Sequence, residues 1–221
     1  MLVWINLDRG GNCAASQPPP SSQQGKFFVI NPSWWGGGGF PRVRIVNEDL
    51  LRTKGTYMFE PPNGDPNQYP EKPHLVHEPV RGNRAGLVRD FECLFGQWIV
   101  SEELKQVFET VDPDGFAFAA CDYTLADGSA GPQWYFCGVL RTLDSLDEAA
   151  SRLKIRTGEY VNGKYYDFSG SACLVFKRRI VGSAHIFLTP HAPTVFCDRI
   201  MRDALKAAKL KGVKLQDATD C

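Results

Sequence analysis

Three side chains near the end of the chain are of types that act in nucleophilic catalysis: Ser183, His185 and Cys197. Ser183 and His185 are two residues apart in an apolar stretch. Because side chains alternate along a strand, a strand here would place both on one face of a sheet. Cys197 begins a predicted helix, whose positive end can lower the pKa of a thiol. However, no G-x-S-x-G motif surrounds Ser183, and no obvious carboxylate is placed to orient His185.

These observations favour structural roles for the three residues, with the cysteine packing as a small half-buried hydrophobe. No group of residues in the sequence joins a nucleophile, a base and an electrophile in one place. An enzyme is therefore the alternative hypothesis: a thiol- or serine-dependent hydrolase that uses Cys197 or Ser183 with His185.

Residues that could bind metals or phosphates show no arrangement typical of such sites. His74 and His77 form an H-x-x-H pair in a proline-rich loop, and no third ligand is spaced nearby. Gly36–Gly39 lacks the Lys-Ser or Lys-Thr of a phosphate-binding loop, so a hinge or loop is expected there. We therefore predict no metal and no cofactor.

The seven cysteines are odd in number and lie far apart, at positions 13, 93, 121, 137, 173, 197 and 221. None is spaced as C-x-x-C, and the pattern fits neither a disulfide framework nor a zinc site. We expect reduced thiols, a cytoplasmic location and a free, exposed thiol at Cys221. The mildly apolar start, Met1–Leu7, has no Lys or Arg before it and is too short for a signal peptide.

Composition excludes several classes of protein. The chain has 221 residues, with 25 Lys and Arg against 25 Asp and Glu. A chain of this length can bury about 70% of the surface that it exposes when unfolded, which gives a sizeable core without disulfides. Zero formal charge argues against direct nucleic-acid binding, which needs a surplus of cations to displace counterions. No window approaches the roughly 18 consecutive apolar residues of a membrane span.

The charge is unevenly distributed along the chain. Residues 101–150 carry ten acids and two bases, a net charge of −8, whereas residues 151–214 carry thirteen bases and four acids, a net charge of +9. The ordinary explanation is that the two halves face each other or form scattered solvated faces. The alternative is an acidic surface that docks a basic partner, with encounter accelerated by electrostatic steering and weakened by salt.

Short β-branched and aromatic runs predict strands along most of the chain. The predicted strands are 26–30, 42–46, 97–100, 116–121, 133–139, 172–176, 184–188 and 213–215. A hairpin of 159–161 and 164–166 is also predicted, because Asn162-Gly163 tolerates the positive φ of a type I′ turn.

Apolar residues at helical spacing predict two longer helices, and a third, short helix is predicted at 144–151. The first spans 101–111, with Ser101 as its N-cap, and the last spans 197–209. The expected inward-facing residues are Leu104, Val107, Phe108 and Val111 in the first, and Ile200, Ala204, Leu205 and Ala208 in the last.

Strands outnumber helices, so the sequence predicts an α+β fold: a mixed, mainly antiparallel sheet with a few short helices packed on it. Residues 1–25 are expected to form a flexible N-terminal segment, rich in Gly, Pro, Ser and Gln. Residues 53–89, rich in Pro, Asn and Gly, should form a long surface loop. We divide the rest into a strand and loop region, 26–96, and an α+β core region, 97–221. The alternative is that these two regions form one continuous domain.

Seven stretches resemble a bacterial family of toxin-neutralising proteins, immunity protein family 11, also described as domain of unknown function 1629. They are GKFFVINP at 25–32, VRIVNEDLL at 43–51, YPEKPHLV at 69–76, WIVSEELKQVFETVDPDGFAFAACDYTLADG at 98–128, GPQWYFCGVLRTLDSLDE at 131–148, LVFKRRIVGSAHIF at 174–187 and VFCDRIMRDALKAAKLKGVKLQDATD at 195–220. The long matches at 98–148 and 174–220 are specific, whereas the Gly-rich and Pro-rich loops are not.

The resemblance implies a protein encoded beside a toxin gene of a polymorphic-toxin or type VI secretion system. Such a protein protects its producer by binding the cognate toxin, which in some systems is a nuclease. The family provides no catalytic residues to carry over. A scaffold subunit without a toxin partner is a third interpretation.

Within that expectation, the charge asymmetry supplies candidate contact residues. Acidic side chains would occupy the toxin's basic substrate groove, and Trp34 or Trp35 would supply an aromatic anchor. Core packing is the alternative for the two tryptophans. The acidic candidates are Glu109, Asp112, Asp114, Asp144, Asp147 and Glu148.

Overall fold

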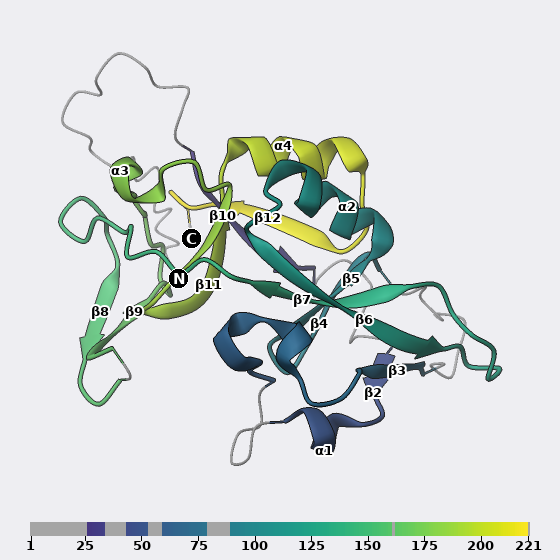
Figure 1. The fold of residues 1–221 in the computed structure, drawn as a ribbon. Helices are drawn as coiled ribbons and strands as arrows, with labels where there is room; N and C mark the ends of the chain where they lie inside the picture. Colours follow the sequence, from purple (N-terminus) through teal and green to yellow (C-terminus); the bar gives the residue numbers. More distant parts are fainter. Residues whose placement is uncertain (1–25, 34–42, 53–58, 79–88, 161, 221) are drawn as a thin grey trace, which may run out of the picture.

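The computed structural model describes residues 26–33, 43–52, 59–78, 89–160 and 162–220. Within these ranges the chain forms twelve strands and four short α-helices, which confirms the predicted α+β fold (Figure 1). The strands form a six-stranded sheet, a four-stranded sheet and a two-stranded hairpin. Among the described strand pairs only one is parallel, so the sheets are mixed and mainly antiparallel, as expected.

The six-stranded sheet is built around the middle of the chain. In spatial order its strands are β2 (Val43–Ile45), β3 (His74–His77), β6 (Phe116–Thr124), β7 (Trp134–Val139), β5 (Gln97–Ser101) and β4 (Phe91–Leu94). β3 runs parallel to β6, and the other neighbours are antiparallel. The strands predicted at 42–46, 97–100, 116–121 and 133–139 are confirmed within a few residues.

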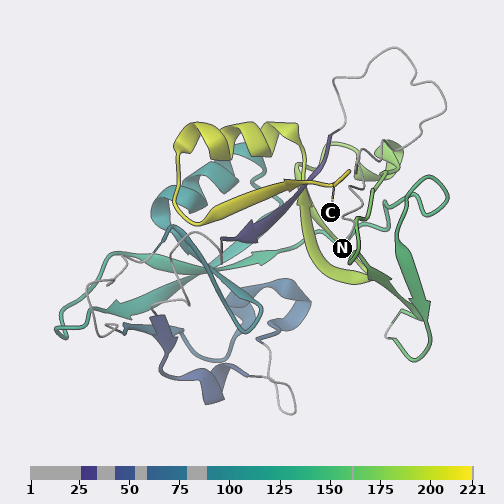
Figure 2. The ribbon, with the colours of Figure 1, turned by 180° about the vertical axis from the view of Figure 1, so that it is seen from behind.

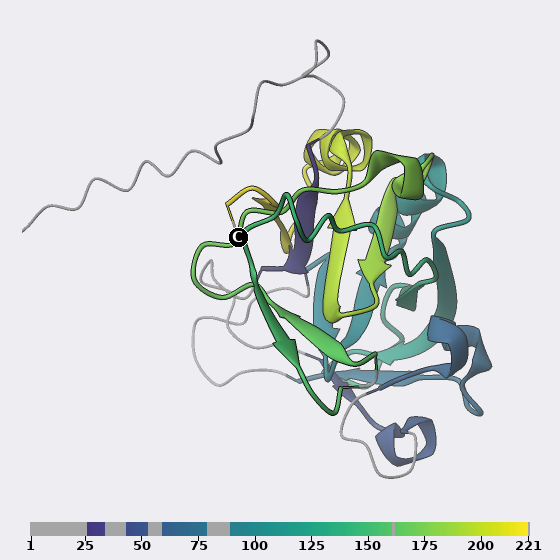
Figure 3. The same ribbon diagram turned by 90° about the vertical axis from the view of Figure 1, so that its left-hand side faces the viewer.

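The four-stranded sheet joins the two ends of the described chain. Its strands, in spatial order, are β10 (Ile186–Thr189), β11 (Ala192–Cys197), β1 (Phe28–Pro32) and β12 (Val213–Asp217), and all neighbours are antiparallel. The hairpin of β8 (Lys154–Thr157) and β9 (Lys164–Asp167) projects at one side of the molecule (Figure 3). Because β1 pairs with β11 and β12, a strand from 26–96 completes a sheet of 97–221.

Helices α2 (Glu102–Val111) and α4 (Arg199–Ala208) lie side by side above the sheets, as both views show (Figures 1 and 2). The Oγ atom of Ser101 accepts a hydrogen bond from the backbone N–H of Leu104 at 3.2 Å, so the predicted N-cap is confirmed. The two other helices, α1 (Glu48–Leu51) and α3 (Arg178–Val181), are single turns. None of the described helices is long and apolar enough to span a membrane.

Helix α4 begins later than predicted, and its buried face differs from the expected one. Cys197 is the last residue of β11, and Asp198 caps the helix by accepting from the N–H of Met201 at 3.0 Å. Met201 and Leu205 are the buried residues of α4 and pack in the central core, whereas Ile200 and Ala208 are exposed. The expectation that Ile200 and Ala208 face inward was wrong.

Alternate residues of the four-stranded sheet enter two separate cores. Phe28 and Ile30 point toward α2 and α4, where they join the central core. Phe27 and Val29 point the other way and pack in a second core that contains Phe187. A third core lies against the six-stranded sheet, and its residues include Val43, Leu51, Phe59, Leu75 and Phe136. The sheets thus separate layers of apolar side chains, as period-2 alternation requires.

The described part of 53–89 is not the long surface loop that the sequence predicts. It contains two 3-10 turns, η1 (Pro62–Gly64) and η2 (Pro66–Gln68), and the strand β3. The η1–η2 segment lies directly on β7, because a Cβ atom at Gly138 would be only 1.9 Å from the carbonyl oxygen of Gly64. Strand β3 has four residues, of which only Leu75 is fully buried. The alternation of apolar and polar residues is therefore too short to identify this strand from the sequence.

Three further predictions in the second half are corrected. No helix forms at 144–151: Leu146 makes an isolated bridge to Phe176, and 148–150 form a turn in which the Asp147 side chain accepts from the N–H groups of Ala149 and Ala150. Residues 172–176 are buried except for Val175, and they make only isolated bridges, to Arg152 and Leu146. The hairpin exists, but its first strand is 154–157 rather than 159–161, so a longer loop replaces the predicted type I′ turn.

The cysteines differ from the expectation at one position. Among the described residues Cys93, Cys121, Cys137 and Cys197 are free thiols, whereas Cys173 is disulfide-bonded. The expectation of reduced thiols throughout was therefore wrong for Cys173. Cys221, predicted to be a free thiol, lies outside the described residues.

Candidate functional site

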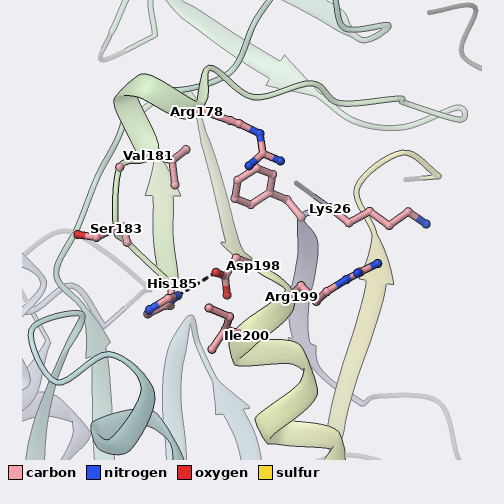
Figure 4. Close-up of a pocket in the computed structure, with 11 residues that line it drawn as sticks. Lys26, Arg178, Val181, Ser183, His185, Asp198, Arg199 and Ile200 are labelled. Atoms are coloured by element: carbon pink, nitrogen blue, oxygen red, sulfur yellow. Dashed lines mark hydrogen bonds and ion pairs between the residues drawn. The ribbon is translucent and has the colours of Figure 1, made fainter. Parts of the chain in front are cut away.

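A cavity of about 330 Å³ lies where α3, the turn after it and the start of α4 meet the beginning of β1 (Figure 4). It is one of the hollows of the described surface and contains two residues of the hydrolase hypothesis, Ser183 and His185. Its other lining residues are Lys26, Phe27, Arg178, Val181, Gly182, Ala184, Asp198, Arg199 and Ile200.

His185 is held in place by two carboxylates. Its Nδ1 atom lies 2.8 Å from Oδ2 of Asp198, and its backbone N–H donates to Oδ2 of Asp112 at 2.8 Å. Asp198 is a carboxylate that orients His185, and sequence reasoning did not find it. Strand pairing could have revealed it: Ile186 lies opposite Cys197 in the β10–β11 register, so the preceding pair brings His185 and Asp198 together.

The two candidate nucleophiles are not joined to this pair. Ser183 lies in the turn before β10 rather than in a strand, and its hydroxyl points away from His185 (Figure 4). The thiol of Cys197 is fully buried, and burial, together with the neighbouring Asp198 carboxylate, raises its pKa well above the usual value. The arrangement therefore lacks an activated nucleophile on His185.

Potential metal ligands are dispersed over the described residues, where no group of three or more His, Cys, Asp or Glu side chains is placed to hold an ion. His74 and His77 lie in β3, not in a loop, and Nε2 of His74 is 3.0 Å from Oγ1 of Thr124 on the neighbouring β6. Gly36–Gly39 lies outside the described residues.

Asp112, one of the six acidic candidates, is buried at the end of α2. Its Oδ2 atom is 2.5 Å from Nη1 of Arg141, and it also accepts from the backbone N–H groups of His185 and Ile186. A carboxylate with these three partners fixes the junction between α2, the exit of β7 and the start of β10. Its side chain is 5% exposed, so little of it is available for contact with another protein.

Asp147 and Glu148 are half-buried and engaged in local contacts. Asp147 caps its own turn, and Glu148 pairs with the Lys164 ammonium and accepts from the Tyr166 hydroxyl at 2.6 Å. The hydrogen bond from Lys164, and to a lesser extent the one from Tyr166, lowers the pKa of Glu148 below its ordinary value. Glu148 thus ties the 148–150 turn to strand β9.

The other three acidic candidates project into solvent. Asp144 has a 64% exposed side chain with His191 Nε2 at 3.8 Å, Glu109 pairs with Lys105 along α2, and Asp114 is exposed beyond the end of that helix. The structure places Glu109 and Asp114 at α2 and Asp144 on the segment after β7. Trp34 and Trp35 lie outside the described residues.

The acidic and basic stretches of the sequence do not neutralise each other. Among the described residues, Lys164–Glu148 is the one ion pair between a Lys or Arg of 151–214 and an acid of 101–150. The remaining pairs of Asp112 and Glu109 are with Arg141 and Lys105 of their own stretch. Mutual ion pairing of the two stretches, which is one part of the ordinary explanation, thus accounts for little of the asymmetry.

Comparison with known proteins identifies the family. The sequence model of the immunity protein family (Imm11) matches residues 26–220, nearly the whole chain. The chain belongs to this family. No curated protein matches it at a significant level. Membership in Imm11 indicates a toxin-neutralising immunity role.

Proposed function

We propose that this Imm11 protein binds a cognate antibacterial toxin and neutralises it stoichiometrically, by covering part of the toxin's surface. The observation that carries the proposal is the family match over residues 26–220. It is supported by the exposed acidic and basic side chains, because charged surfaces steer the encounter between partners and disfavour the binding of wrong partners.

The finer parts of the proposal concern the toxin and the place of action. We propose a toxin encoded by the adjacent gene, such as a nuclease effector of a type VI secretion system, and no direct contact of this protein with nucleic acid or membrane. We also propose a cytoplasmic location, which cell fractionation tests. The disulfide at Cys173 is the structural feature that argues for an oxidising compartment instead.

Co-expression tests the function. The neighbouring toxin gene is expressed in a sensitive bacterial host with and without this protein, and viability is counted. We expect survival only with the protein, and copurification of the two products in a fixed ratio. Equal killing in its presence would refute the role.

For the contact surface we retain the exposed acids, Asp144, Asp114 and Glu109, and leave out Asp112. Reversal of Asp147 and Glu148 would disturb the turn and Tyr166, so Asp144→Lys with Asp114→Lys is the cleaner variant. Glu71→Lys, an exposed acid before β3 with no described partner, is the matched control. We expect at least about tenfold weaker toxin binding at low salt for the double variant and little change for the control. Unchanged binding would exclude these acids as contacts.

The second candidate, a hydrolase, retains one supporting observation: the His185–Asp198 pair in a cavity. His185→Ala distinguishes the two functions. If protection depends on binding alone, the variant should protect as well as the parent once folding is verified by its unfolding midpoint. Loss of protection in a folded variant would favour chemistry.

A further inference from the structure

The cavity between α3 and α4 has a chemical character that the hydrolase hypothesis does not use. Three cationic side chains line it: Lys26, Arg178 and Arg199. They come from the segment just before β1, from α3 and from the first residue of α4, so the fold gathers them from distant parts of the sequence (Figure 4).

The positive charge of the cavity is incompletely balanced by the protein. Lys26 pairs with Asp217, and the lining carboxylate of Asp198 is already bound to His185 and to the N–H of Met201. Arg178 and Arg199 have no ion pair among the described residues, and Nε of Arg199 is buried without a hydrogen-bond partner. A buried donor without a partner is costly, so an acceptor brought by a ligand would be stabilised here.

Further cations and apolar side chains lie near these residues in the sequence. Lys177 and Arg179 are the neighbours of Arg178 in the chain, and neither has an ion pair among the described residues. Ile200, whose side chain lines the cavity, is 57% exposed, and Ile180 is 37% exposed on α3. Guanidinium groups beside exposed aliphatic side chains are suited to a peptide segment that presents a carboxylate next to an apolar residue.

We propose that this cavity is a docking site for an acidic segment of the toxin, whose carboxylates pair with Arg178 and with Arg199 and whose apolar side chain packs against Ile200. The proposal rests on the proposed function and adds a basic contact surface to the acidic one considered above. Charge complementarity selects the occupant, since the described lining has a surplus of positive charge.

Charge reversal at the mouth of the cavity tests the proposal. The binding of the inactive toxin from the adjacent gene is measured by calorimetry for the parent, for Arg178→Glu and for Arg178→Glu with Arg199→Gln. Lys206→Glu, an exposed cation in the last turn of α4, is the matched control. We expect about tenfold weaker binding for the single variant, a larger loss for the double variant and parental binding for the control.

A second pair of variants tests the apolar part. Ile200→Ala should weaken binding about fivefold, because an exposed aliphatic contact is lost. Leu50→Ala on α1, with the same 57% exposure and no place in the cavity, should bind as the parent does. Both residues are exposed, so neither change is expected to prevent folding, which the unfolding midpoint verifies.

The outcomes separate this proposal from the proposed function. If the parent binds the toxin and the cavity variants bind equally well, the docking site is excluded and the immunity function stands. If the parent itself does not bind, both fail. A 20-nucleotide single-stranded DNA that binds the parent and loses affinity in Arg178→Glu, while toxin binding is unchanged, would overturn the proposal in favour of a nucleic-acid site.

Discussion

The carboxylate of Asp112 connects three parts of the molecule: the end of α2, Arg141 after β7 and the backbone that begins β10. One oxygen, Oδ2, receives all three contacts. The backbone N–H groups of His185 and Ile186 need acceptors, because a buried N–H without one is costly. The Asp112 carboxylate supplies the acceptor for both.

Replacement of Asp112 should therefore be costly. We expect Asp112→Ala to lower the free energy of unfolding by about 2–4 kcal/mol, because Arg141 and two backbone N–H groups lose their acceptor. Asp112→Asn retains an acceptor oxygen and should cost less. Urea unfolding measures both, with the exposed Asp114→Ala as the control. A cost for Asp112→Ala no larger than that of the control would contradict this role.

Glu148 should make stability depend on acid pH. Its pKa is lower in the folded protein than the ordinary 4.5, so its contribution is complete above that value and is lost as the pH falls through the folded pKa. We expect the parent to be more stable than Glu148→Gln at pH 7, with the difference disappearing in strong acid. Unfolding midpoints across this range measure it, and a difference independent of pH would refute the linkage.

At the scale of elements, the Pro-rich segment of η1 and η2 owes its place to a glycine in β7. Any side chain at Gly138 would collide with the carbonyl oxygen of Gly64 and with Cδ of Pro66, at 1.9 and 2.8 Å from the added Cβ. The close approach of the two backbones thus needs a residue without a Cβ atom.

We accordingly expect Gly138→Ala to destabilise the protein by about 1–3 kcal/mol, since the turn must move away from the strand. Chemical denaturation gives the magnitude. The substitution adds only one methyl group. An unchanged or increased stability would therefore show that the η1–η2 segment can move away from β7 without cost.

The hairpin is the least covered element of those described. All four residues of β8 are exposed, whereas all five residues of β5 are buried between β7 and β4. Amide hydrogen exchange should therefore be faster in β8 than in β5, because local opening of β8 exposes little additional apolar surface. Equal protection of the two strands would contradict this ranking.

At the scale of the whole molecule, zero net charge coexists with an acidic and a basic stretch that are joined by few ion pairs. Only Lys164–Glu148 links a Lys or Arg of 151–214 to an acid of 101–150 among the described residues. A neutral protein can therefore present both a basic cavity at α3 and exposed acids near α2 and after β7.

Toxin binding should be salt-sensitive as a consequence. We expect the association rate constant to fall about tenfold between low salt and 0.5 M salt, while the dissociation rate constant changes less. Stopped-flow or surface-binding kinetics measure both constants. A rate unaffected by salt would mean that the exposed charges take no part in the encounter.

The sequence by itself determined the family and the elements with strong local signals. Helix α2 carries its own cap at Ser101 and an apolar face of Leu104 and Phe108, and the runs that form β6 and β7 are long enough to be recognised. Such features depend on neighbours a few residues away, so local pattern suffices. The motifs that resemble immunity protein family 11 lie along nearly the same residues, 26–220, that the family model matches.

Only the tertiary structure decided which distant residues meet. The pairing of β1 with β11 and β12, the burial of Asp112 and the contact between His185 and Asp198 all depend on register between segments far apart in the chain. Local sequence does not specify such a register, because it is set by the packing of whole sheets. The cavity at α3 arises in the same way, from cations that lie more than 150 residues apart in the sequence, Lys26 and Arg178.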